Sequence, residues 1–358
     1  MVSDRLVTIV RCPDCRQPLT RRATDLACDG CGRTCGPVDR GFLDLRPSRA
    51  FAETTKYTDE ALHTDARHEQ VSPPLLAAGV RNDMLRRFLR PAPSDRVVDL
   101  GCGSGRMALW NRDLGAWTVG VDVSPFFATE ALARVDLVLG DLRELPFPDG
   151  TFTKAYALDV LEHLSPQALA DMLREASRVL APGGALFVYT HVRKNSPLAL
   201  GLRGINALAR WLESVGALDM TQERLRKSDH LNPIRDIPEL HDVVGRAGFR
   251  IERIRYYTPL IGGFTENIVM RVAERTLARR AARRLAAAGT AATDLDAAAV
   301  KEARTSAKAR LARGGPLLAA LRGMTWLMKA DILLFGRIRS GPFFALLVKD
   351  GSGPPRPA

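Results

Sequence analysis

Residues 97–105 read Val-Val-Asp-Leu-Gly-Cys-Gly-Ser-Gly, and this stretch decides the fold. An apolar run typical of a buried strand contains Asp99 near its end and passes into a glycine-rich turn before a helical pattern. Glycines in such a turn let the backbone approach a ligand closely, and the start of the helix supplies N–H donors. Arg106 stands where the dinucleotide-binding pattern G-x-G-x-x-G requires its third glycine, which disfavours a dehydrogenase.

Short β-branched runs alternate with helical stretches from residue 96 to 258, a pattern typical of βαβ units around a parallel sheet. The expected strands, including one near the C-terminus, are Arg96–Leu100, Thr118–Asp122, Leu137–Leu139, Lys154–Leu158, Ala185–Thr190, Arg250–Tyr256 and Pro342–Val348. Three acids, Asp99, Asp122 and Asp141, lie at successive strand ends, so we expect them to meet at one sheet edge. There a carboxylate at Asp122 can accept both hydroxyls of a ribose, and Asp141 can accept from an adenine amino group.

This pattern resembles class I S-adenosylmethionine-dependent methyltransferases of the type 11 methyltransferase-domain group. The resemblance also rests on residues 145–152 (Leu-Pro-Phe-Pro-Asp-Gly-Thr-Phe), 159–164 (Asp-Val-Leu-Glu-His-Leu) and 178–184 (Arg-Val-Leu-Ala-Pro-Gly-Gly). It implies an α/β fold with a Rossmann-like, seven-stranded methyltransferase sheet that ends in a hairpin. It also implies S-adenosylmethionine as the methyl donor.

The same resemblance implies a set of cofactor-binding residues. It places Asp99 and Gly101 near the methionine part of the cofactor, and Asp159 near the sulfonium. The ribose is expected at Asp122 and the adenine at residues 141–142. The full expected set is Asp99, Gly101, Gly103, Gly105, Asp122, Asp141, Leu142 and Asp159.

Five of the six cysteines lie in the first 35 residues. Cys12 and Cys15 form one Cys-x-x-Cys pair and Cys28 and Cys31 another, and four thiolates on two short loops suit tetrahedral Zn²⁺. The N-terminus shows no signal-peptide pattern, so metal ligands are favoured over disulfides and a reducing cytoplasm is expected. A four-sulfur site leaves no open position, so this zinc is expected to be structural. The segment resembles the zinc-binding part of the guanine-N1 ribosomal RNA methyltransferases.

Composition divides the chain into four segments. We expect a zinc ribbon in 1–48, a helical linker that covers the cofactor in 49–95, and a methyltransferase domain in 96–350. The domain carries a helical insertion, 259–340, before its last strand, and the Gly/Pro-rich tail 351–358 is expected to be disordered. With 46% hydrophobic and 26% charged residues, the 358-residue chain is neither a largely disordered protein nor a polytopic membrane protein.

The chain carries 52 Lys and Arg against 40 Asp and Glu, a net charge of +12 that favours an anionic partner. Within the insertion, residues 275–284 predict a basic helix face and residues 316–336 an amphipathic helix. The residues expected to share its apolar face are Leu317, Leu321, Met324, Met328 and Phe335. Charges interrupt this helix, so we expect peripheral contact with the inner membrane surface rather than a span. Two alternatives are RNA binding through phosphates, and a helix 316–336 that only packs on the domain as a lid or dimer face. The sequence does not indicate the oligomeric state.

The methyl group of a sulfonium is already activated, so the protein must mainly align an acceptor and remove a proton from an oxygen nucleophile. His163, His191 and His230 are the candidates for that base, whereas Glu162 is interpreted as structural. The preferred function is methylation of an O or C atom of an apolar or lipid-linked small molecule. Two alternatives stay open: a ribosomal or transfer RNA base methyltransferase, and a non-catalytic cofactor-binding or regulatory module.

Overall fold

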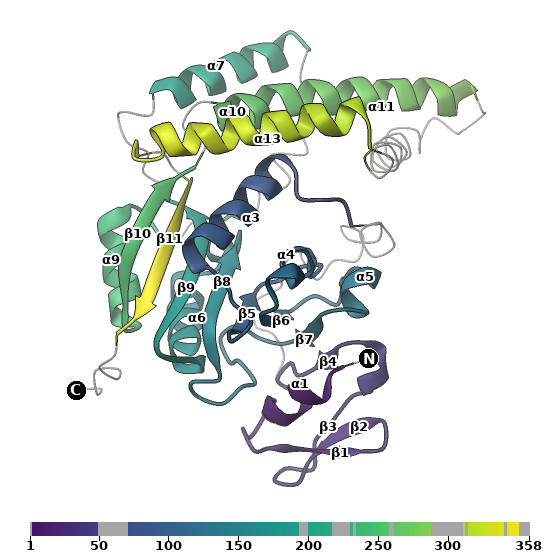
Figure 1. Cartoon of the computed structure of the whole chain (residues 1–358), viewed down its shortest axis with the longest axis vertical. Helices are drawn as coiled ribbons and strands as arrows, with labels where there is room; N and C mark the ends of the chain where they lie inside the picture. The colour runs from purple at the N-terminus through teal and green to yellow at the C-terminus, as the bar shows by residue number, and fades with distance from the viewer. Residues whose placement is uncertain are drawn as a thin grey trace.

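The structure is a computed structural model that describes residues 2–48, 71–192, 200–216, 230–231, 234–257, 261–287, 311, 314–339 and 342–350. Its largest feature is an eight-stranded sheet (Figure 1). The strands are β4 (Leu43–Asp44), β5 (Arg96–Leu100), β6 (Trp117–Asp122), β7 (Asp136–Leu139), β8 (Phe152–Leu158), β9 (Leu180–His191), β10 (Phe249–Tyr256) and β11 (Pro342–Lys349). Across the sheet the order is β10-β11-β9-β8-β5-β6-β7-β4.

The seven strands expected from the sequence are all present, so the α/β methyltransferase-type sheet is confirmed. Strands β7, β6, β5, β8 and β9 run parallel, while β11 is antiparallel to both β9 and β10. An eighth strand, β4, comes from the N-terminal segment and pairs in parallel with β7, Leu43 opposite Val138. Two residues are too few to show an alternating pattern, so β4 could not be predicted from the sequence.

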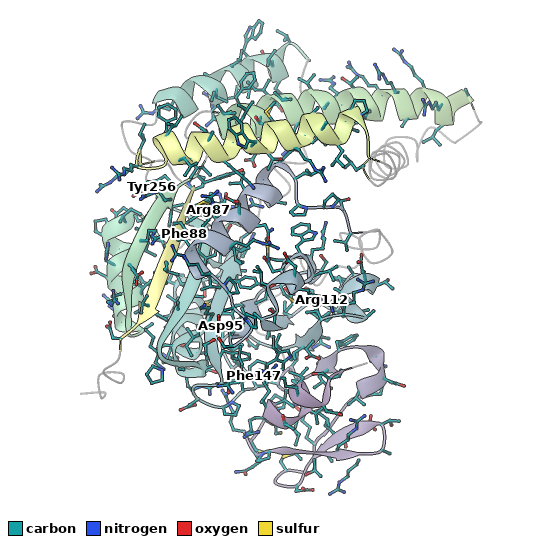
Figure 2. All side chains as sticks on the ribbon, viewed as in Figure 1. Arg87, Phe88, Asp95, Arg112, Phe147 and Tyr256 are labelled. Atoms are coloured by element: carbon teal, nitrogen blue, oxygen red, sulfur yellow. The ribbon has the colours of Figure 1, made fainter. Side chains whose placement is uncertain are left out.

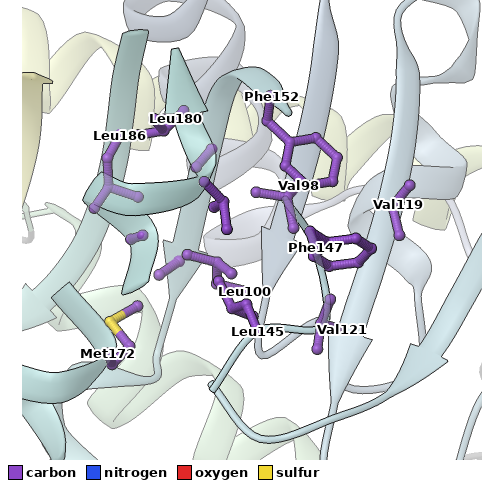
Figure 3. Packing of buried hydrophobic residues seen from close by; sticks show 14 of the residues in the cluster. Val98, Leu100, Val119, Val121, Leu145, Phe147, Phe152, Met172, Leu180 and Leu186 are labelled. Carbon is purple, nitrogen blue, oxygen red and sulfur yellow. The ribbon is translucent and has the colours of Figure 1, made fainter. Parts of the chain in front are cut away.

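Helices cover both faces of this sheet. They are α3 (Leu76–Leu89), α4 (Arg106–Trp110), α5 (Thr129–Leu132), α6 (Pro166–Val179) and α9 (Ile237–Arg246), with short turns η3 (Arg112–Leu114) and η4 (Leu161–His163). Helix α6 begins where the Ser165 hydroxyl accepts from the Ala168 N–H, with Pro166 at the first helical position. Its buried face, which includes Met172, lies in one core cluster with Val98 of β5 and with Phe147 of the segment between β7 and β8 (Figure 3). The core thus fixes the strand ends at which the predicted acids lie.

A layer of helices covers one end of the molecule (Figure 1). It contains α7 (Leu200–Ser214), α10 (Ile261–Phe264), η5 (Thr265–Val269), α11 (Met270–Ala287) and α13 (Pro316–Phe335). The predicted helical insertion is therefore present, and α13 packs on α3. The predicted apolar face of α13 is wrong in part, because Leu317 and Phe335 are exposed whereas Thr325 is buried. None of the helices in the described part of the chain has the length and apolar run needed to cross a bilayer.

The N-terminal segment forms a small unit at the other end of the molecule (Figure 1). It contains α1 (Asp4–Ile9), η1 (Val38–Arg40) and a three-stranded sheet of β1 (Leu19–Arg22), β2 (Asp25–Cys28) and β3 (Thr34–Cys35). Leu6 and Leu26 are fully buried in the same core cluster as Val138 of β7. The hydroxyl of Ser3 also donates to Asp136 over 2.6 Å, so the unit is packed on the main sheet. Residues 49–70 of the predicted linker 49–95, and the predicted tail 351–358, lie outside the described residues.

Candidate functional site

A cavity of about 610 Å³ opens at the carboxyl ends of the parallel strands. All eight residues predicted to bind a cofactor except Gly105 line it, and His163 does as well. Helix α3, from the predicted cover segment, contributes Ala78 and Arg81. The remaining walls are partly apolar, with Met107, Trp110 and Phe126 among the lining side chains. The site therefore combines an acidic edge with apolar walls, which suits an organic ligand that carries positive charge and polar groups.

The glycine-rich turn is shaped by backbone conformations that side chains rarely adopt. Gly101 and Gly105 have φ angles of 76° and 77°, in the left-handed region. A Cβ added at Gly101 would lie 2.4 Å from a methyl carbon of Val160, so the turn also packs too tightly for a side chain. Gly105 borders Ala131 and Leu137 rather than the cavity, so its role is to begin α4.

Asp99 is the most deeply buried of the cavity acids, with 3% of its surface exposed. Burial, reinforced by the charge of Asp122, raises the pKa of Asp99 to about 8, although the Tyr156 hydroxyl opposes the shift. Among the described residues, Asp99 Oδ2 has no hydrogen-bond partner. A buried carboxylate oxygen without a donor is costly, so this position suits a cationic donor from a ligand.

The pKa of Asp99 predicts that stability depends on pH. In the unfolded chain Asp99 ionises near 3.8, so between that value and about 8 the folded chain holds the extra proton. The contribution of Asp99 to the free energy of unfolding must therefore fall as the pH rises through this window. We expect Asp99→Asn to gain stability relative to wild type over that window, on the order of 5 kcal/mol at the alkaline end, in urea denaturation. Parallel pH curves for the two proteins would contradict this assignment.

Asp122 and Asp141 hold the loops that follow β6 and β7. Asp122 accepts from the Gly103 N–H over 2.7 Å and from the Ser124 N–H over 2.9 Å, which ties the glycine-rich turn to the end of β6. Burial raises the pKa of Asp122, although those backbone donors oppose the shift. Asp141 receives both the backbone N–H and the guanidinium of Arg143. Arg143 contacts both oxygens of Asp141, through its backbone N–H, Nε and Nη2, so a ligand would have to share these oxygens with Arg143.

Asp159 follows β8 and faces Arg81 of α3. Their side chains form an ion pair at 3.0 Å, and the Arg81 guanidinium lies 4.6 Å from the centre of the Tyr189 ring. Asp159 has φ 55°, a strained conformation for a residue with a side chain, which is a feature of functional sites. Burial raises its pKa, although Arg81 opposes the shift. Arg81 was not predicted from the sequence, because the sequence does not indicate which strand end an arginine on a preceding helix will contact.

The three predicted histidines come together beside the cavity. The ring centres of His163 and His230 are 4.6 Å apart, and those of His191 and His230 are 5.9 Å apart. Glu162, 1% exposed, lies among them: its Oε1 is 3.3 Å from His191 Nδ1, and its Oε2 accepts from the Thr190 hydroxyl. Burial opposes ionisation of Glu162, but His191 outweighs it and lowers the pKa. Such a cluster can accept a proton or ligate a metal, since donor atoms of Glu162, His163 and His230 lie within 4.8 Å of one another.

The four predicted metal-ligating cysteines also come together. The sulfurs of Cys12, Cys15, Cys28 and Cys31 all lie within 4.8 Å of one another. Two of the sulfur pairs are separated by 3.6 Å (Cys12–Cys31) and 3.3 Å (Cys15–Cys28), close to the roughly 3.8 Å edge of a tetrahedron of Zn–S bonds. Backbone N–H groups of residues 30 and 31 donate to the Cys28 sulfur. Cys35 is buried and lies outside this cluster.

Comparison with known proteins agrees with this geometry. Residues 98–188 match the family model described as a methyltransferase domain. All four cavity acids and His163 lie inside the matched stretch, whereas His191, His230 and the cysteine cluster lie outside it.

Three curated methyltransferases are similar to this chain over part of their length. Ubiquinone biosynthesis O-methyltransferase of Azorhizobium caulinodans is 34% identical over 39% of this chain and 59% of its own. Sterol 4-C-methyltransferase strm-1 of Caenorhabditis elegans is 35% identical over 27% of this chain and 31% of its own. 27-O-demethylrifamycin SV methyltransferase of Amycolatopsis mediterranei is 29% identical over 41% of this chain and 57% of its own. The chain thus spans less than two thirds of each of these relatives.

Proposed function

We propose that this chain is an S-adenosylmethionine-dependent methyltransferase. The observation that carries the proposal is the set of acids at successive strand ends around the glycine-rich turn, inside the stretch that matches a methyltransferase domain. The partnerless oxygen of Asp99 fits the ammonium group of the methionine part, and Asp122 fits the ribose hydroxyls. Asp141 and Leu142 would hold the adenine, with Asp159 near the sulfonium.

When bound, the cofactor supplies a methyl group on a cationic sulfur. The chain's own residues must then align the acceptor and take up its proton. His163 is the member of the histidine cluster that lines the cavity, so we assign it the role of the base that takes up the proton of an acceptor hydroxyl. His191, which faces Glu162, and His230, which packs against both other rings, act as positioning residues.

This assignment predicts a selective loss of rate in His163→Ala. Removing a general base typically costs about 10²- to 10⁴-fold, so we expect kcat to fall by that range while the dissociation constant of S-adenosylmethionine stays within about twofold. His241, exposed on α9, provides the matched control His241→Ala, which should keep full rate. The measurement is turnover with the acceptor beside calorimetric cofactor titration. Full turnover by His163→Ala would contradict the assignment.

For the acceptor we propose an apolar or lipid-linked small molecule, methylated on oxygen or carbon. The support is the partly apolar wall of the cavity, together with relatives named for ubiquinone biosynthesis, a sterol and a rifamycin. Comparing metabolites of a strain that lacks the gene with those of its parent tests the proposal. We expect an apolar compound that lacks one methyl group to accumulate. Accumulation of undermethylated RNA instead would contradict it.

We also propose that the cysteine cluster binds a structural Zn²⁺. The sulfur spacing and the backbone donors to Cys28 fit a tetrahedral site with four thiolates and no open position. Such an ion would close the turns that carry β1, β2 and β3, a unit too small to supply its own core. It would have no part in methyl transfer.

A further inference from the structure

A second cavity, of about 380 Å³, lies between α3, β10 and α13. It shares no lining residue with the cofactor cavity. Arg87 and Phe88, which line it from α3, lie beside the β10–β11 hairpin (Figure 2). Its charged lining residues are Arg87, Arg90, Arg253, Arg255, Lys329 and Asp83. Five cations and one carboxylate give the pocket a formal charge of +4, far from the mixed charge of an ordinary surface.

The single carboxylate is already engaged. Asp83 accepts from Arg87 Nε over 2.6 Å and from Lys329 Nζ over 3.1 Å. The Arg253 guanidinium instead lies over the Phe88 ring, 5.0 Å from its centre, which leaves its N–H fork available to a ligand. Arginines in a recess bind phosphate oxygens through charge-assisted, bidentate hydrogen bonds. The lining therefore suits a phosphate group.

The rim of this pocket is apolar on its α13 side. Leu333 lines the pocket and is 70% exposed, and the adjacent Leu334 is 73% exposed. Trp326, two turns before Leu333 on the same side of the helix, is 66% exposed. Exposed arginines, Arg322 and Arg337, border this apolar stripe at its two ends. The opposite face of α13, which includes Met328 and Ile332, is buried in the core, so the stripe is not the face that packs on α3.

We propose that this pocket binds the phosphate group of an anionic lipid while the exposed stripe of α13 enters the adjoining membrane interface. A headgroup site beside exposed Trp and Leu side chains is the arrangement by which interfacial helices hold a membrane surface. The apolar rim favours a lipid over a soluble phosphate compound. The exposed leucines can leave water by entering a membrane interface, whereas a small soluble ligand would leave them exposed. The proposal is independent of methyl transfer.

Co-sedimentation of the full chain with vesicles tests the proposal. We expect binding to vesicles of phosphatidylglycerol and phosphatidylcholine, and little binding to phosphatidylcholine alone. The pocket variant Arg90→Gln/Arg253→Gln should weaken binding by about 25-fold, because each basic residue near an anionic surface contributes about fivefold. The matched control is Arg279→Gln/Arg280→Gln, which removes the same charge from exposed positions of α11. Equal losses in both variants would mean diffuse attraction and overturn the site.

Two further arms identify the source of the phosphate group and the role of the rim. The variant Leu333→Ser/Leu334→Ser keeps every charge. We expect its vesicle binding to weaken by about tenfold or more, because it removes two leucine side chains that would be buried in the membrane interface. Glycerol phosphate, as a soluble probe, should bind in calorimetry far more weakly than vesicles do. Tight glycerol phosphate binding without vesicle binding would overturn the lipid assignment, as would vesicle binding that the leucine variant retains in full.

Discussion

Asp122→Ala is expected to lower the affinity for S-adenosylmethionine by about 100-fold. In our account the carboxylate accepts both ribose hydroxyls, and two hydrogen bonds to a charged group contribute roughly 3 kcal/mol together. The same side chain also holds the N–H groups of Gly103 and Ser124, so its loss loosens the turn that the methionine part of the cofactor contacts. Isothermal titration calorimetry measures the change directly.

A second, milder substitution separates loss of the ribose contact from general damage to the local structure. Asp122→Asn keeps one acceptor oxygen but loses the second acceptor and the charge, so we expect an intermediate loss of about tenfold. Glu252→Ala removes an acid from an exposed position of β10 and should bind normally. Unchanged affinity in Asp122→Ala would refute the ribose contact.

Loss of a proposed zinc ligand is expected to have the largest effect on stability. Zinc binding contributes about 10–16 kcal/mol to the folding of small zinc-finger peptides, so Cys12→Ala should unfold the unit of β1–β3. Because Leu6 and Leu26 share a core cluster with the main sheet, the damage should extend to β4 and β7. We expect purified Cys12→Ala to contain no zinc and to be cleaved rapidly by protease within residues 2–48.

Cys35→Ala is the matched control for this experiment. Cys35 is as buried as Cys12 and lies in the same unit, but its sulfur is outside the four-sulfur cluster. We expect Cys35→Ala to contain one zinc per chain by elemental analysis and to resist protease nearly as well as wild type does. The structural role would be wrong if metal-free Cys12→Ala were as resistant as Cys35→Ala.

The central strands of the sheet were predictable because they are buried on both faces. In Arg96–Leu100 the apolar residues Val97, Val98 and Leu100 mark the strand, and Asp99 and the glycines that follow mark its end. The cysteine cluster was predictable for a related reason, since two Cys-x-x-Cys pairs already fix most of a tetrahedral site. In both cases local spacing in the sequence determines the local geometry.

Features that depend on contacts between distant segments were not predictable. Glu162 was interpreted as structural, but its contacts with His191 and Thr190 form only when the chain folds and could not be predicted. The pairing of Arg81 with Asp159 likewise joins residues from different elements. In α13, apolar residues occur all round the helix, so periodicity could not show that Met328 would be buried and Leu333 exposed.

We propose above all that the acids at the strand ends hold S-adenosylmethionine. The most direct measurement is an experimental structure of the chain with S-adenosylhomocysteine, the product form of that cofactor. Our account predicts the ribose at Asp122, the adenine beside Asp141 and the methionine ammonium group at Asp99. A nucleoside bound elsewhere, or a cavity filled by the chain itself with no nucleoside in the crystal, would contradict it.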